Sequence, residues 1–385
     1  MKMLINTSNL YFGGGLQVAL SFINELKTMS QKYNYYIFLS QAIKNQINLD
    51  SFTENFIFYV LETTPAKLQS RRKIVQKLDS LEKSIAPDIV FSVFGPSYWK
   101  PKTKHIMGFA NGWMLQKDSI AYSRLDFLQR VKMHLWVEYI QYYVGRDASY
   151  YILETEDARG RLQKLLQVDK KNTFVVGNSY SSIFNMKELL LEKSKYYIHL
   201  PPKEKNEYRL LLISHNQPSK NIKIVNELIP LLKNYNIKFV FTIDELSFHS
   251  LFPNKPIEVI NIGPIAQKSC PSLYKQCDAL FLPTLLEIFT ASYPEAMKMK
   301  VPILTSNYSF AKEICGDAAL FFNPLSPRDI IEKIITLSQN KSLQKDMILK
   351  GEQRVLEFET ARSRAEKYIG ICEKVINAEE ECVNV

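Results

Sequence analysis

The sequence predicts an α/β protein built from two doubly wound domains, each a parallel sheet flanked by helices. Short runs of β-branched and aromatic residues alternate with amphipathic helical stretches, a pattern typical of such sheets. The pattern restarts at residue 209, after a polar, proline-containing stretch. The chain has 385 residues, of which 46% are hydrophobic, and this is enough for two cores.

The first half contains several strand-like runs. The strands expected here are 1–7, 35–39, 88–93, 150–153 and 173–176, with another short strand before Gly108. A helix is expected over about 16–29, directly after three consecutive glycines. We therefore expect a first domain at 1–190.

The second half repeats this order of elements. Its expected strands are 209–214, 238–243, 257–260, 279–282, 303–305 and 319–322, and a helix is expected at 222–234. The boundary falls in 180–207, where Pro201-Pro202 opens a stretch without periodicity. The prediction is a second domain at 191–365 and a C-terminal helix at 366–385 that returns to the first domain.

Positive charge is concentrated in the first half. The net charge is +10, and residues 1–190 carry 24 Lys and Arg against 16 Asp and Glu. This favours an anionic partner, such as a membrane surface or a phosphorylated substrate, although lysine-rich solubility explains it as well. Basic and aromatic residues mix over 117–146, which fits either an interfacial helix or an ordinary half-buried one.

The cysteines and the length of the apolar segments indicate the cellular compartment we expect. The five cysteines form no C-x-x-C pair, so free thiols in a reducing cytosol are the simplest interpretation. There is no signal-peptide pattern at the start and no apolar window of about 18 residues. No D-x-D or zinc-ligand spacing occurs. We expect a cytoplasmic protein with no metal and no cofactor.

Two glutamates mark the most informative segment. A strand ends near Pro283, a loop carries Glu287, and a helix that opens at about 291–294 carries Glu295. This order places both carboxylates and a helix N-terminus, which suits a diphosphate, at the mouth of the sheet. Two alternatives stay open. Glu295 could complete a capping box with Ser292, and Glu287 could be a solvated loop acid.

This segment resembles the E-x7-E signature of retaining glycosyltransferases of family 4, also called glycosyl transferases group 1. Phe289 and Ala296-Met297 fit the surroundings of the signature, and 301–304 matches the strand that follows it. Lys300 stands where the family has a glycine. The resemblance implies the GT-B fold, in which two Rossmann-like domains face each other across a cleft and the second binds the nucleotide-sugar donor.

The resemblance also implies roles for residues of the second domain. Glu287 would contact the donor sugar and Glu295 the ribose. Lys220 would bind the diphosphate, with His215 where the family often has Arg, and Gly263 would lie at the turn near the base. The donor loop is completed by Phe289, Thr290 and Ala291. Ile288 and Thr290 replace family glycines, which predicts a more crowded approach to the phosphate.

The glycine-rich segment near the N-terminus is a candidate loop of the acceptor side. Gly13, Gly14 and Gly15 permit close backbone approach but do not form G-x-G-x-x-G. In the family such a loop faces the donor phosphate and the acceptor; the alternative is a tight strand–helix turn. Asn111 is expected to line the acceptor side, and Asn178 to be structural.

The expected function is transfer of a sugar from a nucleotide diphosphosugar to a saccharide or lipid-linked saccharide, with retention and without a metal. The resemblance and the basic first half suggest bacterial surface polysaccharide synthesis, of capsule or lipopolysaccharide, at the inner face of the plasma membrane. A nucleic-acid partner is not expected. A UDP-sugar 2-epimerase and a degenerate nucleotide-sugar-binding protein are the alternatives.

Overall fold

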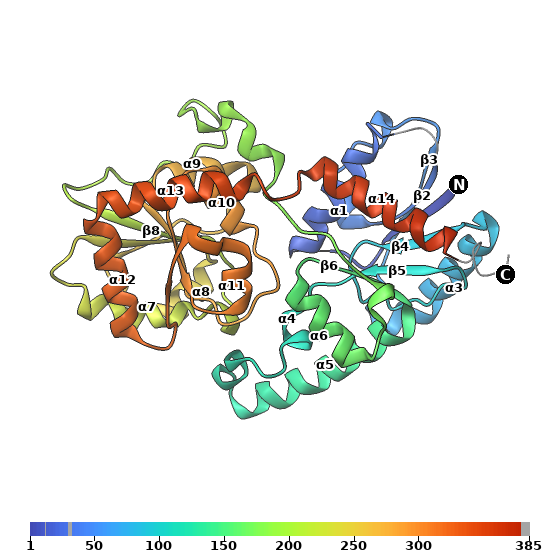
Figure 1. Cartoon of the computed structure of the whole chain (residues 1–385), viewed down its shortest axis with the longest axis horizontal. Helices are drawn as coiled ribbons and strands as arrows, with labels where there is room; N and C mark the ends of the chain where they lie inside the picture. Colours follow the sequence, from blue (N-terminus) through green and yellow to red (C-terminus); the bar gives the residue numbers. More distant parts are fainter. Residues whose placement is uncertain (12, 30–32, 379–385) are drawn as a thin grey trace. The chain divides into compact units, whose positions relative to one another are not determined.

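The computed structural model describes residues 1–11, 13–29 and 33–378 (Figure 1). Contacts divide the chain into two units. Unit 1 contains Met1–Lys117, Leu128–Asn178 and the chain from Glu359 onward. Unit 2 contains Asp118–Phe127 and Ser179–Phe358. Each unit holds one parallel sheet, so the predicted pair of α/β sheets is confirmed.

The sheet of unit 1 has seven strands in the described residues, in the order β3-β2-β1-β4-β5-β6-β7. These are β1 (Lys2–Thr7), β2 (Asn34–Ser40), β3 (Phe56–Leu61), β4 (Ile89–Ser92), β5 (His105–Gly108), β6 (Tyr150–Leu153) and β7 (Thr173–Val175). The helices are α1 (Gly13–Leu26), α2 (Gln41–Lys44), α3 (Leu68–Ile85), α4 (Gly112–Leu115), α5 (Phe127–Asp147), α6 (Glu156–Leu166) and α14 (Ala361–Asn377). The edge strand β3 is an element that the sequence analysis lacks.

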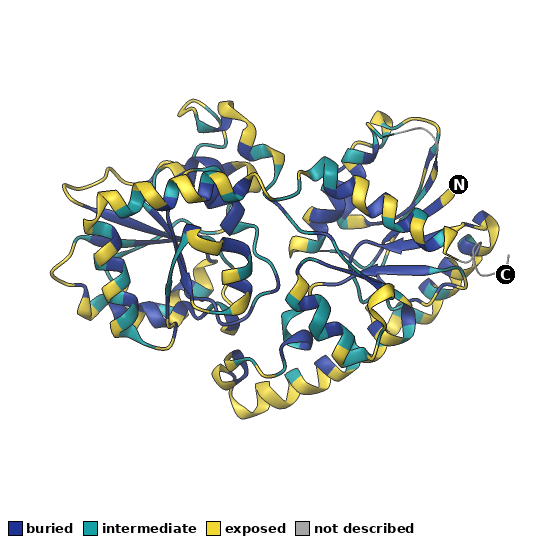
Figure 2. Cartoon of the chain, viewed as in Figure 1, coloured by how far each residue is buried: buried dark blue, intermediate teal, exposed yellow. Residues whose placement is uncertain are grey.

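The sheet of unit 2 has six strands, in the order β10-β9-β8-β11-β12-β13. These are β8 (Tyr208–Leu212), β9 (Ile237–Phe241), β10 (Val259–Asn261), β11 (Ala279–Leu282), β12 (Ile303–Ser306) and β13 (Ala319–Phe322). The helices are α7 (Val225–Leu228), α8 (Glu245–Leu251), α9 (Cys270–Lys275), α10 (Ser292–Lys298), α11 (Ser309–Cys315), α12 (Pro327–Gln339) and α13 (Lys341–Val355). Figure 2 shows buried strands under helices with exposed outer faces.

The boundaries between the units differ from the predicted ones. The chain crosses at Asn178–Ser179 rather than at 190, because the segment that follows packs Phe184 and Leu200 into the core of unit 2. It returns at Glu359 rather than at 366. The returning helix α14 packs on unit 1, where the rings of Tyr368 and Phe22 meet edge to face at 5.3 Å.

The helix expected at 222–234 is broken into short pieces. Two 3-10 turns, at Ile222–Ile224 and Ile229–Leu231, flank the single turn of α7. Pro230 has no amide hydrogen to donate to an α-helical ladder. The chain therefore does not continue as one α-helix at this proline.

Each sheet reverses its strand order at one point. In unit 1 the reversal lies between β1 and β4, and in unit 2 between β8 and β11. The loops that leave the carboxyl ends of these two neighbouring strands diverge to opposite faces of the sheet and open a crevice, where ligands of open α/β sheets bind. The fold therefore provides one candidate crevice in each unit.

Replacing Lys300 by glycine is expected to raise the free energy of unfolding. Lys300 follows α10 with a left-handed φ of 59°, and the amides of Lys300 and Val301 bond back to Met297 O and Ala296 O as in a Schellman motif. A side chain in this conformation costs about 1 kcal/mol. The Lys300–Glu352 ion pair is largely exposed and offsets little of this.

Chemical denaturation measures this effect, and Lys300→Ala is the matched control. Alanine removes the ion pair but keeps the strain, so only Lys300→Gly should gain stability. A glycine variant no more stable than the alanine variant would contradict this account.

Candidate functional site in unit 2

Two opposite charges meet at the crevice of unit 2. Lys220 ends the short 3-10 turn η6 (Pro218–Lys220) after β8, and Glu287 lies in the loop after β11. Lys220 Nζ and Glu287 Oε1 form an ion pair. Their side chains are 23% and 15% exposed, so both charges are shielded yet reachable. The structure thus brings together the residues predicted to contact the donor diphosphate and the donor sugar, which are 67 positions apart in the chain.

Hydrogen bonds from both sides hold this ion pair in place. The carbonyl of Ser219 accepts from the Thr284 hydroxyl (3.0 Å) and the Leu285 amide (2.6 Å), which ties η6 to the loop that carries Glu287. The Ser119 hydroxyl donates to Leu285 O at 3.1 Å. Asn221 follows Lys220 at φ 51°, a left-handed conformation that asparagine tolerates. These hydrogen bonds therefore fix the backbone on both sides of the ion pair.

Glu295 lies inside the unit rather than on its surface. Its residue is 8% exposed, and the Tyr274 hydroxyl donates to Oε2 at 3.2 Å. The helix N-cap is Ala291, with no side-chain capping bond, so the capping-box alternative with Ser292 is wrong. Burial raises the pKa of the Glu295 carboxyl to about 7, and the Tyr274 bond opposes this. Tyr274, on the separate helix α9, left no sequence signal.

Stability should fall as pH rises through the titration of Glu295. The pKa of about 7 lies above the ordinary 4.5, so between these pH values the folded protein holds a proton that the unfolded chain has lost. Ionisation of the buried carboxyl then destabilises the fold. Thermal melts from pH 5 to 8 should decline less for Glu295→Gln than for wild type. Parallel declines would contradict the buried titration.

The other predicted donor residues occupy different environments. His215 is exposed in the loop after β8. Gly263 has φ +73° and open space where a Cβ would lie, so a ligand has room there. The half-buried Phe289 packs on Phe358 with ring centroids 6.1 Å apart. Thr290 and Ala291 are half-buried and lead into α10, where their carbonyls accept from Tyr293 and Glu295 amides at 3.3 and 2.9 Å.

The two positions where family glycines are replaced do not strain the backbone. Ile288 and Thr290 are absent from the described residues with a positive φ. Ile288 is buried at 5% exposure, so its side chain points away from solvent. The loop therefore forms without left-handed residues at these two positions.

Unit 1 holds the remaining predicted residues. Gly13, Gly14 and Gly15 begin α1 at the carboxyl end of β1, as expected for a strand–helix turn. Asn111 caps α4, and its Oδ1 accepts from the Met114 amide at 3.1 Å, which is a structural role. Asn178 Nδ2 donates to Glu154 Oε1 at 2.8 Å, and Arg364 donates to its Oδ1, a structural network as expected.

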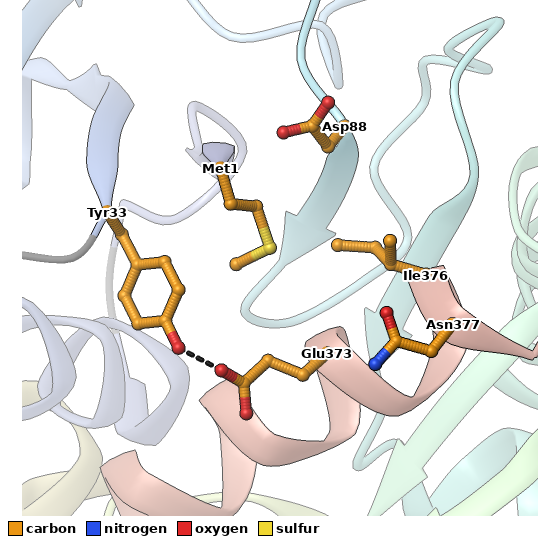
Figure 3. Close-up of a pocket in the computed structure, with 6 residues that line it drawn as sticks. All are labelled: Met1, Tyr33, Asp88, Glu373, Ile376 and Asn377. Carbon is orange, nitrogen blue, oxygen red and sulfur yellow. Dashed lines mark hydrogen bonds between the residues drawn. The ribbon is translucent and has the colours of Figure 1, made fainter.

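A separate pocket of about 420 Å³ opens at the amino ends of the unit 1 strands. Figure 3 shows the Tyr33 hydroxyl bonded to Glu373 on α14 there, with Asp88 and Met1 nearby. None of the predicted site residues lines it. Since ligands of parallel sheets bind at the opposite, carboxyl edge, this pocket is not our candidate site.

The described residues contain no group of three or more metal-ligating side chains. Burial raises the pKa of the thiols of Cys270 and Cys277 to about 12, and Cys315 and Cys372 are also buried and free. Cys382 lies outside the described residues. Among the helices within the described ranges, none is both long and apolar enough to cross a membrane.

The two parallel sheets with helices on both faces define the GT-B architecture of glycosyltransferases, and comparison with solved structures supports this. A glycosyltransferase from Rickettsia africae ESF-5 is similar at a TM-score of 0.69 and 14% identity, over 97% of this chain and 98% of that one. A sucrose-phosphate synthase from Thermosynechococcus elongatus has a TM-score of 0.70 and 11% identity, over 98% and 100%. WaaG, a glycosyltransferase involved in lipopolysaccharide biosynthesis, has a TM-score of 0.67 and 13% identity, over 97% of this chain and 99% of that one.

The family match lies within unit 2. Residues 199–354 match the model of the family described as Glycosyl transferases group 1. The match contains Lys220, Glu287 and Glu295. No curated protein sequence matches the chain significantly.

Proposed function

We propose that the protein transfers a sugar from a nucleotide diphosphosugar to a hydroxyl of a saccharide or lipid-linked saccharide, with retention of anomeric configuration. The Lys220–Glu287 ion pair at the crevice of the family-matched unit carries this proposal. The bond between the anomeric carbon and the diphosphate breaks and the diphosphate leaves with the electron pair. The acceptor oxygen bonds to that carbon and passes its proton to the departing diphosphate.

The residues of unit 2 suit the demands of this step. The Lys220 ammonium neutralises negative charge that grows on the leaving diphosphate, a form of stabilisation that needs no metal. Glu287, next to Lys220, would face the donor sugar. Glu295 in its ionised form would accept hydrogen bonds from the ribose hydroxyls.

A melting screen over nucleotide sugars, followed by product analysis in EDTA, tests the proposal. A ligand at 100 times its Kd stabilises a protein by about 2.7 kcal/mol, which is readily measured. NMR of the product should show a new glycosidic bond with the configuration of the donor. An isomerised nucleotide sugar as product would indicate an epimerase instead. Binding of a nucleotide sugar without turnover would indicate a degenerate protein. Loss of activity in EDTA would indicate a metal-dependent enzyme.

We further propose that helix α5 docks unit 1 on an anionic membrane surface, where lipid-linked acceptors of surface polysaccharide synthesis would be reached. Leu128, Val131, Leu135 and Tyr142 recur at spacings of three, four and seven, which places them on one helical face. They are 68%, 43%, 68% and 60% exposed. The opposite face buries Val137, Ile140 and Val144, so the helix is apolar on both sides.

The charge around this exposed stripe fits lipid headgroups. Arg130 and Lys132 are exposed beside it, and residues 1–190 as a whole carry an excess of basic side chains. Apolar residues that enter the headgroup region together with cations that attract anionic lipid are the two ingredients of interfacial binding.

The wild-type protein should therefore sediment with vesicles of phosphatidylglycerol and phosphatidylcholine at low salt and be released at high salt. Leu128→Ser combined with Leu135→Ser should abolish sedimentation without lowering the melting temperature, since both side chains are exposed. Leu246→Ser and Leu356→Ser, in unit 2, change equally exposed leucines and serve as controls. Sedimentation equal to wild type in the α5 variant would rule out this docking surface.

A further inference from the structure

The two carboxylate oxygens of Glu295 lie in different surroundings. Oε2 accepts a hydrogen bond from the Tyr274 hydroxyl at 3.2 Å. Oε1 has no hydrogen-bond partner among the described residues, yet it is not one of the unpaired atoms that the fold encloses completely. Oε1 therefore reaches solvent and accounts for part of the 8% exposure of Glu295. One oxygen is held by the protein and the other is open to a ligand.

The donor of this bond has a fixed place in the core of unit 2. Tyr274 is fully buried, and the ring of Phe184 meets its ring edge to face with centroids 5.9 Å apart. Burial raises the pKa of Tyr274 well above its ordinary value, so the hydroxyl keeps its hydrogen at neutral pH. That hydrogen faces Glu295 Oε2 and, at 3.3 Å, the Ser292 carbonyl in the first turn of α10. The hydroxyl thus acts as a donor toward α10.

In the described part of unit 2, no cation contacts Glu295. The titratable groups that face it are Tyr274 and the Cys270 thiol, whose pKa burial raises to about 12, so neither is charged at neutral pH. Helix α13 also packs on α10, but its Glu352 pairs with Lys300. Burial raises the pKa of the Glu295 carboxyl to about 7, and the Tyr274 bond opposes this because it favours the charged form. Ionisation of Glu295 therefore depends on one neutral donor.

We infer that Tyr274 is a positioning residue for the ribose contact: its hydroxyl orients Glu295 with Oε1 toward the ligand and keeps the carboxylate ionised. That the ligand is the ribose of the donor rests on the proposed function, whereas the effect of Tyr274 on Glu295 does not. An ionised carboxylate only accepts hydrogen bonds, and a protonated one carries a hydrogen on one of its two oxygens. Donor binding should therefore strengthen as pH rises through neutrality.

Titration calorimetry of the full chain with UDP, ADP and GDP at pH 6 to 9 tests this inference. For a nucleotide that binds, Tyr274→Phe should weaken Kd about three- to tenfold at pH 7 and less than about twofold at pH 9, since loss of a hydrogen bond to a charged group shifts an ionisation by about one pH unit. With the 2′,3′-dideoxy form of that nucleotide, variant and wild type should bind alike. Tyr208→Phe is the control, because it removes a buried hydroxyl of unit 2 without a partner among the described residues.

Melting curves of the ligand-free protein over the same pH range test the effect of Tyr274 on Glu295 by itself. Stability should fall with rising pH until Glu295 ionises in the folded protein, because the unfolded chain has already lost this proton. The fall should end near pH 7 in wild type and about one pH unit higher in Tyr274→Phe. In a Glu295→Gln background, Tyr274→Phe should leave the pH profile unchanged.

The two experiments fail in distinguishable ways. If no nucleotide binds but the melting profiles differ as expected, the proposed function fails and the positioning of Glu295 by Tyr274 stands. Equal melting profiles overturn the inference. So does a Tyr274→Phe protein whose affinity is unchanged at every pH, or reduced equally at pH 7 and pH 9 or for the dideoxy nucleotide, because a purely structural role would act alike on all of these. Sugar transfer by the wild-type protein would leave the proposed function intact in those cases.

Discussion

Replacing Lys220 by alanine is expected to weaken nucleoside diphosphate binding roughly ten- to hundredfold, or about 1.5–3 kcal/mol. A charged hydrogen bond to phosphate is lost from a partly shielded site, where the side chain is only 23% exposed. Titration calorimetry measures the change. Lys223→Ala is the control, since Lys223 is an exposed lysine three residues further along the same loop. Equal affinity in the Lys220 variant and wild type would make Lys220 a surface lysine.

The same calorimetric experiment on a Glu287 variant is expected to give the opposite result to the Lys220 variant. Glu287 forms an ion pair with Lys220, so a diphosphate that binds Lys220 would replace a carboxylate that already satisfies the ammonium. Glu287→Gln removes this competitor while it keeps the shape of the side chain. The Glu287→Gln protein should therefore bind the diphosphate alone at least as tightly as wild type. Weaker binding would show that Glu287 positions Lys220 rather than competes for it.

Much of this architecture could be predicted from local sequence. The runs at Tyr150–Leu153, Ala279–Leu282 and Ala319–Phe322 form strands with the expected bounds, because buried parallel strands are short and continuously apolar. β3 has the same aromatic and β-branched composition, and the same reasoning extends to it. The boundary at Asn178 was harder to place, because the segment after it looks like a linker until Phe184 is seen in a core.

The candidate site, too, could be predicted from the sequence only in part. Lys220 and Glu287 could be placed at the same sheet edge because both follow strands of the predicted second sheet. The bond from Tyr274 to Glu295 depends on how α9 packs against α10, and the bonds from Asn9 Nδ2 to Phe94 O and Pro96 O depend on the loop after β4. Such contacts join residues without a shared spacing or motif. Sequence patterns therefore indicate where a crevice forms better than which side chains meet in it.

The two glutamates should affect catalysis in different ways. The ribose that Glu295 would hold is the same in substrate and transition state, so Glu295→Gln should raise KM for the donor more than it lowers kcat. Glu287 pairs with the lysine that would neutralise the leaving diphosphate and would face the sugar whose bond breaks. Interactions that strengthen in the transition state act on kcat, so Glu287→Gln should lower kcat chiefly, by about 10²- to 10³-fold.

Steady-state kinetics and a melting curve for each variant measure this difference. Glu373→Gln, at the pocket of unit 1 that no predicted site residue lines, is the control and should keep wild-type kinetics. Glutamine preserves the bond that Tyr274 donates to residue 295, so a KM effect there reports on the ligand and not on unfolding. A wild-type donor KM in the Glu295 variant together with a wild-type kcat in the Glu287 variant would remove both residues from the active site. A kcat loss confined to Glu287→Gln would instead locate the chemistry at the Lys220–Glu287 pair, because the buried carboxylate of Glu295 would have been changed without that effect.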